Sequence, residues 1–435
     1  MSGATGREAV AAVWRIESAR IVGALARYTG DFALAEDLAQ EALAEALVTW
    51  PRDGVPGNPA GWLLTVGRRR AIDAFRRRAV RDDRYAALAR GLGEGGAAAG
   101  AVPAGSAGPA GTGDPADGDV LWDPDRIDDD VLALMFISCH PVLSREARVA
   151  LTLRVVGGLT SDEIARAFLV ATATVQARIT RAKKTLGAAR VPFEVPPAAE
   201  RAGRLGSVLN VIYVVFTEGA SASSGAELIR AELAGEAQRL ARVLARLMPG
   251  EPEVHGLLAL LELTAARFPA RTGPDGEPVL LERQDRGRWD RAAIGRGHAA
   301  LARAVRAGRG LGPYGLQAAI AECHAVAPSV EATDWDRIVV LYEALGRLAP
   351  SPVVELNRAV AVSMARGPAA ALPIVDGLAA AGALAESHLL PTVRGELLTR
   401  LGRGGEARAE LERAARLCGN ERERTVLERK IAALP

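Results

Sequence analysis

The segment that decides the fold is residues 157–190, GGLTSDEIARAFLVATATVQARITRAKKTLGAAR. Thr160 can cap free backbone amides, and Glu163 can reach back to complete a capping box, so the pattern predicts a helix start. That helix must end by residues 169–171, where Thr172 offers an N-cap for the next helix. The segment therefore predicts two short helices joined by a tight turn.

The second of these helices has an apolar side and a cationic side. The apolar residues at helical spacing, which we expect to face a core, are Val175, Ile179, Ala182 and Leu186. The opposite side carries hydrogen-bonding and basic residues: Thr174, Gln176, Arg178, Arg181, Lys183 and Lys184. Such a helix fits a DNA major groove flanked by phosphates. The alternative is a surface helix whose charges only face solvent.

Composition limits the fold class and the compartment. The chain has 435 residues, 49% hydrophobic but only 4% aromatic, which favours an all-α fold of two to four domains. A net charge of +2 means that any nucleic-acid surface must be local. The three cysteines are widely spaced, and no run of apolar residues is long enough for a membrane span. We therefore expect a soluble, cytoplasmic protein with no membrane association.

Residues 1–90 form a first part with polarised charge. Up to Gly61 it contains 5 basic and 8 acidic residues, and from Trp62 to Arg90 it contains 9 basic and 3 acidic residues. The acidic half predicts an amphipathic helix capped by Asp31, with an apolar side of Leu34, Leu38, Ala42 and Ala46 and a polar side of Asp37, Gln40, Glu41 and Glu45. In the basic half, inward packing is expected for Trp62, Val66, Ile72 and Phe75, while the arginines project. This pattern indicates a module that binds one protein and one nucleic acid.

Three further segments follow. Residues 91–130 are rich in Gly, Ala, Pro, Ser and Asp, which predicts a flexible acidic linker, with helix resuming at Val131. Residues 131–192 contain the two-helix motif. Residues 193–435 predict a long helical region in which 356–367 can be aligned with 393–404, each followed by an Ala- and Leu-rich helix. This offset of 37 residues is close to the period of tetratricopeptide helix pairs, which stack into a protein-binding face. An ordinary helical bundle is the alternative.

The order of these motifs resembles a known family. The segment Asp37-Leu38-Ala39-Gln40-Glu41, the Trp62–Asp73 segment and the 159–186 helix-turn-helix look like regions two and four of bacterial sigma factors of the extracytoplasmic-function group. The third part resembles the C-terminal extension of a subgroup with tetratricopeptide-like repeats. The matching segments are Tyr213–Gly219, Gln284–Trp289, Thr333–Trp335 and Ser351–Val360.

The resemblance implies domains, partners and roles. Region two would be 1–90, the linker 91–130, region four 131–192, and a TPR-like regulatory domain 193–435 with its own protein partner. Core RNA polymerase would dock on Asp37, Gln40 and Glu41. Single-stranded minus-ten promoter DNA would contact Trp62, Arg68, Arg69, Arg70, Arg76 and Arg77. Minus-thirty-five DNA would contact Thr172, Thr174, Gln176, Arg178, Arg181 and Lys184. Such factors commonly have Asn where this chain has Arg69, which puts the base reading at minus ten in doubt.

Other functions fit the sequence less well. Cys139-His140 and Cys323-His324 each supply only half of a metal site, so no metal, cofactor or catalytic residue is expected. The 284–289 segment is interpreted as polar packing, and Trp289, Trp335 and Tyr342 as core anchors. A one-component repressor leaves the acidic helix unexplained. An enzyme on a helical scaffold would need clustered catalytic groups, whereas the five histidines are scattered.

Overall fold

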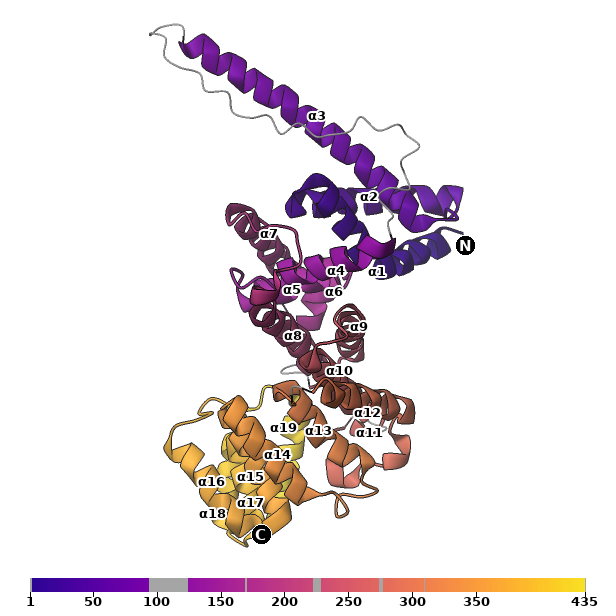
Figure 1. Ribbon diagram of the computed structural model, residues 1–435. Coiled ribbons are helices and arrows are strands. Elements are labelled where there is room, and N and C mark those ends of the chain that lie inside the picture. Colours follow the sequence, from indigo (N-terminus) through magenta and orange to yellow (C-terminus); the bar gives the residue numbers. More distant parts are fainter. Residues whose placement is uncertain are drawn as a thin grey trace. The chain divides into compact units, whose positions relative to one another are not determined.

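The computed structural model describes residues 2–93, 124–168, 170–221, 228–273, 277–308 and 310–434 (Figure 1). Within these ranges it contains helices α1–α19 and no strand beyond one isolated bridge between Thr272 and Pro278. The all-α fold class is confirmed. Most of the predicted linker, residues 94–123, lies outside the described ranges. None of the helices that the structure describes combines the length and the apolar character of a membrane span.

The chain divides into two compact units, residues 1–164 with 172–208 and residues 165–171 with 209–435. The helices that form or begin in the first unit are α1 (Ser2–Thr29), α2 (Phe32–Asp53), α3 (Pro59–Gly93), α4 (Pro124–Ser138), α5 (Arg145–Val155), α6 (Ser161–Phe168), α7 (Thr172–Ala188) and α8 (Ala198–Ala220). Helix α4 begins before the expected start at Val131.

One core joins the N-terminal helices of the first unit to the helix-turn-helix. Helix α1 contacts α2, α3, α4 and α5, and α2 contacts α7. The large, fully buried side chains of this core include Ile21, Leu25, Trp50, Leu63 and Phe136. Burying each such side chain contributes about 1.5–3 kcal/mol to the free energy of folding. Because these side chains are shared between helices, the N-terminal helices are coupled to α4 and α5.

The predicted capping box of the helix-turn-helix is confirmed. The Thr160 amide donates to Glu163 Oε2 at 2.7 Å, and the Glu163 amide donates to Thr160 Oγ1 at 3.1 Å. The turn before it contains Gly158, whose φ of 71° is a left-handed conformation that favours glycine. A Cβ at Gly158 would also lie 2.7 Å from Ser18 Oγ of α1. The turn between α5 and α6 therefore packs closely on α1.

The second unit is a series of helices after α8. Its α-helices are α9 (Ala231–Leu247), α10 (Pro252–Ala265), α11 (Phe268–Arg271), α12 (Arg291–Arg306), α13 (Pro313–Val326), α14 (Trp335–Leu348), α15 (Pro352–Arg366), α16 (Pro368–Ala380), α17 (Leu389–Arg400), α18 (Gly404–Leu417) and α19 (Glu421–Ala432). Two 3-10 helices, η2 (Leu281–Arg283) and η3 (Arg286–Arg288), lie between α11 and α12.

The aligned segments of the second unit form two successive helix pairs. The first is α15 with α16 and the second is α17 with α18, and each helix from α13 to α19 contacts the next. A single apolar cluster runs beneath α13–α18 and includes Ile338, Leu356, Val375 and Leu398. Neighbour-to-neighbour packing of this kind buries one continuous core along the series.

Candidate polymerase and promoter interface

Helix α2 presents the predicted acidic face because its apolar side is buried. Asp31 caps the helix as expected, since its carboxylate accepts hydrogen bonds from the Ala33 and Leu34 amides at 2.9 and 3.1 Å. Leu38, Ala42 and Ala46 are buried as predicted, whereas Leu34 is half-buried. On the opposite side Asp37 and Glu41 are exposed and Gln40 is half-buried.

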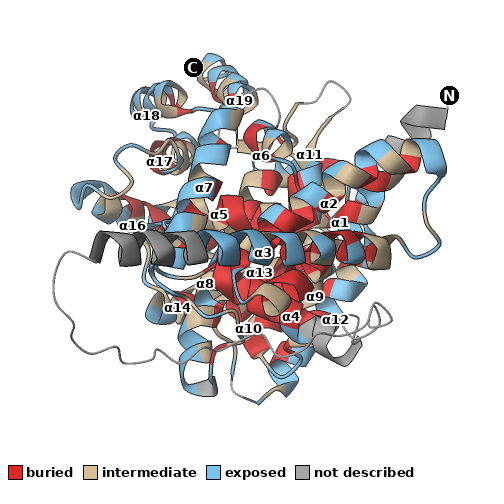
Figure 2. Cartoon of the chain, turned by 90° about the horizontal axis from the view of Figure 1, so that it is seen from above, coloured by how far each residue is buried: buried red, intermediate tan, exposed pale blue. Residues whose placement is uncertain are grey.

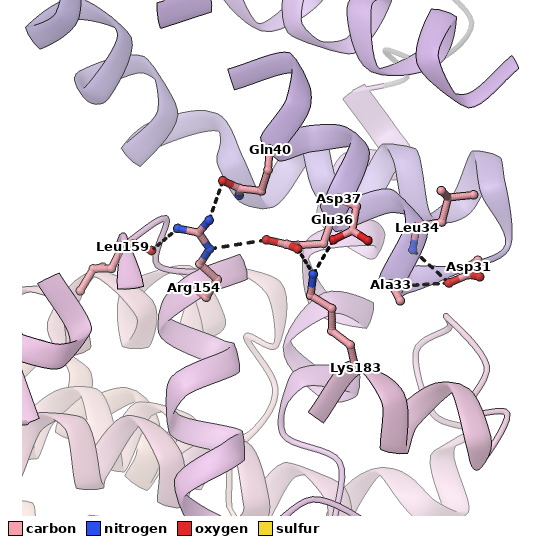
Figure 3. A network of polar contacts seen from close by, with 9 residues as sticks. All are labelled: Asp31, Ala33, Leu34, Glu36, Asp37, Gln40, Arg154, Leu159 and Lys183. Carbon is pink, nitrogen blue, oxygen red and sulfur yellow. Dashed lines mark hydrogen bonds and ion pairs between the residues drawn. The ribbon is translucent and has the colours of Figure 1, made fainter. Parts of the chain in front are cut away.

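A polar network joins α2 to the helix-turn-helix around a buried acid (Figure 3). The Glu36 side chain is only 3% exposed and forms an ion pair with Lys183 of α7. The Arg154 guanidinium of α5 lies 3.5 Å from Glu36 Oε1 and donates to Gln40 Oε1 at 2.6 Å. Lys183 also donates to Asp37 Oδ1 at 2.7 Å. Two of the three residues predicted to bind core polymerase, Asp37 and Gln40, are therefore bonded to the module predicted to bind DNA.

Lys183 is charged in this network. Burial lowers the pKa of its ammonium group, but attraction and hydrogen bonds from Glu36 and Asp37 outweigh burial, and the net pKa is raised. A raised lysine pKa favours the contact below the ordinary value of 10.5, and the contact weakens only as pH rises through the raised value. Deprotonation of Lys183 therefore does not open the contact near neutral pH.

The third predicted polymerase-binding residue, Glu41, is paired with α3. Arg70 donates to Glu41 Oε2 at 2.8 Å and to Glu45 Oε2 at 2.7 Å. These groups are partly exposed, so each pair contributes little stability, about 0–1 kcal/mol. Arg70, which we predicted to bind DNA, thus also links α2 to α3 in this structure.

The remaining minus-ten candidates divide into anchored and exposed side chains. Trp62 is half-buried and packs edge-on against Trp50, with ring centroids 5.5 Å apart. The Arg68 guanidinium lies 5.6 Å from the centre of the Tyr28 ring. The exposed candidates are Arg69, Arg76 and Arg77. A cationic surface next to aromatic rings is the combination that single-stranded nucleic acid requires.

The predicted inward packing of the basic helix was partly wrong. Val66 is buried, but Ile72 and Phe75 are each 36% exposed. The described part of α3 beyond residue 71 has no buried residue, as the largely pale blue stretch in Figure 2 shows. Ile72 and Phe75 therefore lie at the edge of the core rather than inside it. Phe75 lies beside Tyr28, with ring centroids 6.4 Å apart.

Helix α7 has the predicted two-sided character. Its buried residues are Val175, Ile179, Ala182 and Leu186, as expected from the sequence. Thr174, Gln176, Arg181 and Lys184 are exposed, and Arg178 is half-buried. The prediction of Thr172 as an N-cap was wrong: α7 begins at Thr172, whose hydroxyl donates to Asp162 Oδ1 of α6 at 2.8 Å. That bond instead fixes α6 against α7.

Glu36 and Arg154 were not predicted as site residues from the sequence. Glu36 lies between the apolar and polar sides of α2, so helical periodicity could not assign it to either. The partners of Arg154 on α2 are more than 100 positions away in the sequence, as the Arg154–Gln40 separation of 114 shows. A basic residue flanked by apolar ones in Leu153-Arg154-Val155 was the only available signal.

The two Cys-His pairs are part of the packing. Cys139 is fully buried with its sulfur 3.2 Å from Thr152 Oγ1, and burial raises the pKa of its thiol to about 11. Cys323 is buried too, and the His324 ring packs edge-on against Trp335. Trp289 is 2% exposed, which confirms it as a core anchor. Trp335 and Tyr342 pack against the apolar cluster while partly buried.

Comparisons with known proteins match three parts of the chain. Residues 15–81 match sigma-70 region 2, residues 133–186 match sigma-70 region 4, and residues 204–305 match a family of unknown function, DUF6596. The chain is 44% identical over 419 residues to an uncharacterized protein of Rhizobium meliloti (strain 1021), covering 92% of this chain and 90% of that protein. No solved structure matches the chain.

The chain therefore contains matches to both sigma-70 regions, and these matches support a sigma-70-family factor. The region 2 match covers the acidic face of α2 and the basic face of α3, and the region 4 match covers the helix-turn-helix. These regions imply core RNA polymerase and promoter DNA as partners in promoter-specific transcription. Sigma-70 factors are non-catalytic initiation factors. The DUF6596 match ends at residue 305, before the helix pairs of α15–α18.

Proposed function

We propose that the chain is a sigma factor of the extracytoplasmic-function group with a C-terminal regulatory arm. The observation that carries this proposal is the combination in one chain of an acidic α2, a basic and aromatic α3, and a capped helix-turn-helix, with α2, α3 and α7 in the same compact unit. A repressor would need only the last of these. An enzyme would need a clustered acid, base or nucleophile. In the described contacts between α2, α3 and α7, acidic side chains of α2 pair with basic side chains of the other two helices.

In this proposal the exposed residues of each predicted site have the roles that the resemblance implies. Asp37, Gln40 and Glu41 dock on core polymerase. The exposed Arg69, Arg76 and Arg77 follow the phosphates of the opened minus-ten strand, while the exposed Phe75 offers a ring for base stacking. On α7, the exposed polar side reads the minus-thirty-five element in the major groove.

The network around Glu36 adds a step to this function. While Lys183 and Arg154 are bonded to α2, Asp37 and Gln40 cannot offer the same lone pairs to polymerase. We infer that the contact between α2 and α7 opens before polymerase docks. The free protein would then be an equilibrium between a closed arrangement and an open, binding-competent one.

The helix pairs of α15–α18 support a TPR-like regulatory role for the second unit. Their 37-residue offset and sequential packing are typical of stacked helix pairs that bind protein partners. The regulatory arm would bind either a separate protein or the promoter-binding unit.

Transcription with purified core polymerase tests the function. The wild-type protein should support run-off transcription from a cognate promoter fragment. Asp37→Arg with Glu41→Arg should abolish co-elution with core enzyme and transcription, because charge reversal places cations on the docking face. Helix content should stay unchanged, since both side chains are exposed. Normal co-elution of the double variant would refute the docking assignment, and a wild-type protein that never binds core enzyme would refute the sigma factor proposal.

A further inference from the structure

Three side chains capable of binding a metal meet near the C-terminus of the second unit. His388 directly precedes α17, Cys418 directly follows α18, and Glu423 lies in the first turn of α19. Their ligand atoms all lie within 4.8 Å of one another. His388 Nε2 is 3.4 Å and Cys418 Sγ is 4.0 Å from Glu423 Oε2. Helices α17 and α18 separate His388 from Cys418 and Glu423 in the sequence, so no short motif reveals the three residues together.

The distances fit a tetrahedral ion. Bonds of about 2.0 Å to nitrogen and oxygen and about 2.3 Å to sulfur place neighbouring ligand atoms roughly 3.3–3.5 Å apart. The His388–Glu423 distance of 3.4 Å falls in that range, and the Cys418–Glu423 distance of 4.0 Å needs only a small side-chain rotation. A thiolate, a carboxylate and a neutral imidazole together carry two negative charges, which balance a divalent cation.

The loop between α18 and α19 holds two of these ligands in place. The Asn420 side chain, only 2% exposed, accepts hydrogen bonds from the Arg422 and Glu423 amides at 3.0 and 3.2 Å. Arg424 donates to the Cys418 carbonyl at 2.8 Å. Cys418 is itself 2% exposed and packs in an apolar cluster that includes Leu427 of α19. The ligands are therefore preorganised by the fold, which lowers the entropic cost of binding.

The chemistry of the group selects the ion. Sulfur and imidazole ligands favour Zn²⁺ and related transition metals over Ca²⁺ and Mg²⁺, which prefer oxygen. The side chains of His388 and Glu423 are 27% and 31% exposed, which leaves an entry path and a position for a water ligand.

We propose that His388, Cys418 and Glu423 bind one transition-metal ion, best satisfied by Zn²⁺, which ties α19 to the ends of α17 and α18. This site is independent of the promoter-binding function. In the structure the Cys418 thiol points to the Asn420 carbonyl at 3.4 Å, and His388 pairs with Glu423.

Metal titration of the full-length, chelator-treated protein tests the proposal. Zn²⁺ should bind by calorimetry with one ion per chain and should raise the thermal midpoint of unfolding, because it binds only the folded site. Co²⁺ should give a thiolate-to-cobalt charge-transfer band and tetrahedral visible bands. Absence of a one-to-one Zn²⁺ complex in the wild type would overturn the proposal.

Variants assign the ligands. Cys418→Ser should abolish the charge-transfer band. His388→Gln and Glu423→Gln should each weaken Zn²⁺ binding by more than the roughly 10- to 100-fold that loss of an outer-shell partner costs. These last two side chains are partly exposed, so the variants can fold even if Cys418→Ser does not.

Matched controls come from the same unit. Cys323→Ser removes its other described cysteine, which is also buried and free. His298→Gln removes a histidine paired with Glu322 at 2.5 Å. Both controls should bind Zn²⁺ and Co²⁺ like the wild type. A band that survives Cys418→Ser, or that is lost in Cys323→Ser alone, would place the metal elsewhere and refute the assignment.

Discussion

Removal of the Lys183 side chain should increase the affinity of the protein for core polymerase. Lys183 joins Glu36 and Asp37 across the contact between α2 and α7. In Lys183→Ala the closed arrangement loses both ion pairs, while α2 keeps every acidic residue proposed to dock on polymerase. The equilibrium should therefore shift toward the open, binding-competent arrangement.

The magnitude follows from burial. The Asp37 side chain is 64% exposed, so its pair with Lys183 contributes only about 0–1 kcal/mol. The Glu36 side chain is 3% exposed, and a charged hydrogen bond there contributes about 1.5–3 kcal/mol, although Arg154 remains beside it. A net loss of about 2 kcal/mol corresponds to about 30-fold in the equilibrium between closed and open forms. The apparent Kd for core enzyme should fall by up to this factor.

The assay is a fluorescence titration of labelled protein with core polymerase at fixed salt. Lys184→Ala is the matched control, because Lys184 is the adjacent lysine and is exposed. It should leave the affinity for core enzyme unchanged. If Lys183→Ala and Lys184→Ala bind core enzyme with the wild-type Kd, the contact does not limit docking and the reasoning is wrong.

Three other predictions concern α7 and the second unit. Arg178→Ala or Arg181→Ala should weaken binding to duplex DNA that carries the minus-thirty-five element, as measured by footprinting. Loss of a base contact should cost about 1–3 kcal/mol of binding free energy and relax the base preference at one position, whereas loss of a phosphate contact should mainly reduce the salt dependence of the affinity. Truncation after Arg190 should change run-off transcription severalfold if the C-terminal region is regulatory, and equal activity of two equally stable proteins would contradict that role. Burial, with Arg267 and Arg286 nearby, lowers the pKa of His324 from 6.5 to about 4. As pH falls, the histidine is protonated in the unfolded state at a higher pH than in the folded state, so the free energy of unfolding should decrease by about 3 kcal/mol between pH 6.5 and pH 4. His324→Phe, which keeps a ring against Trp335, should lose this part of the pH dependence in denaturant unfolding.

Local signals in the sequence predicted much of the fold. The buried residues of α7, the Asp31 cap and the Thr160–Glu163 capping box depend on spacings of two to four residues, which helical geometry fixes. The predicted burial of Ile72 and Phe75 failed for a different reason. Periodicity identifies an apolar side but does not reveal whether another helix covers it fully, and these two side chains are only partly covered.

The candidate site was predictable only in part, because side-chain partners depend on tertiary packing. Asp37, Gln40 and Glu41 were correctly placed on one polar side of α2. Their partners Lys183, Arg154 and Arg70 come from three other helices. Nothing in the local sequence distinguishes Lys183, which pairs with Glu36, from Lys184, which is exposed. One position along a helix turns a side chain by about 100°, so neighbouring lysines can have different environments.

The buried carboxylate of Glu36 is the feature of the first unit that packing alone does not explain. A buried acid costs stability unless charged partners compensate, and here those partners come from α5 and α7. If α2 only had to hold these helices, well-packed apolar residues in place of the ion pair would be equally or more stable. A carboxylate has an advantage where the contact also has to open, because water solvates the released charge. The polar character of this contact therefore fits an α2 surface that alternates between an intramolecular partner and polymerase.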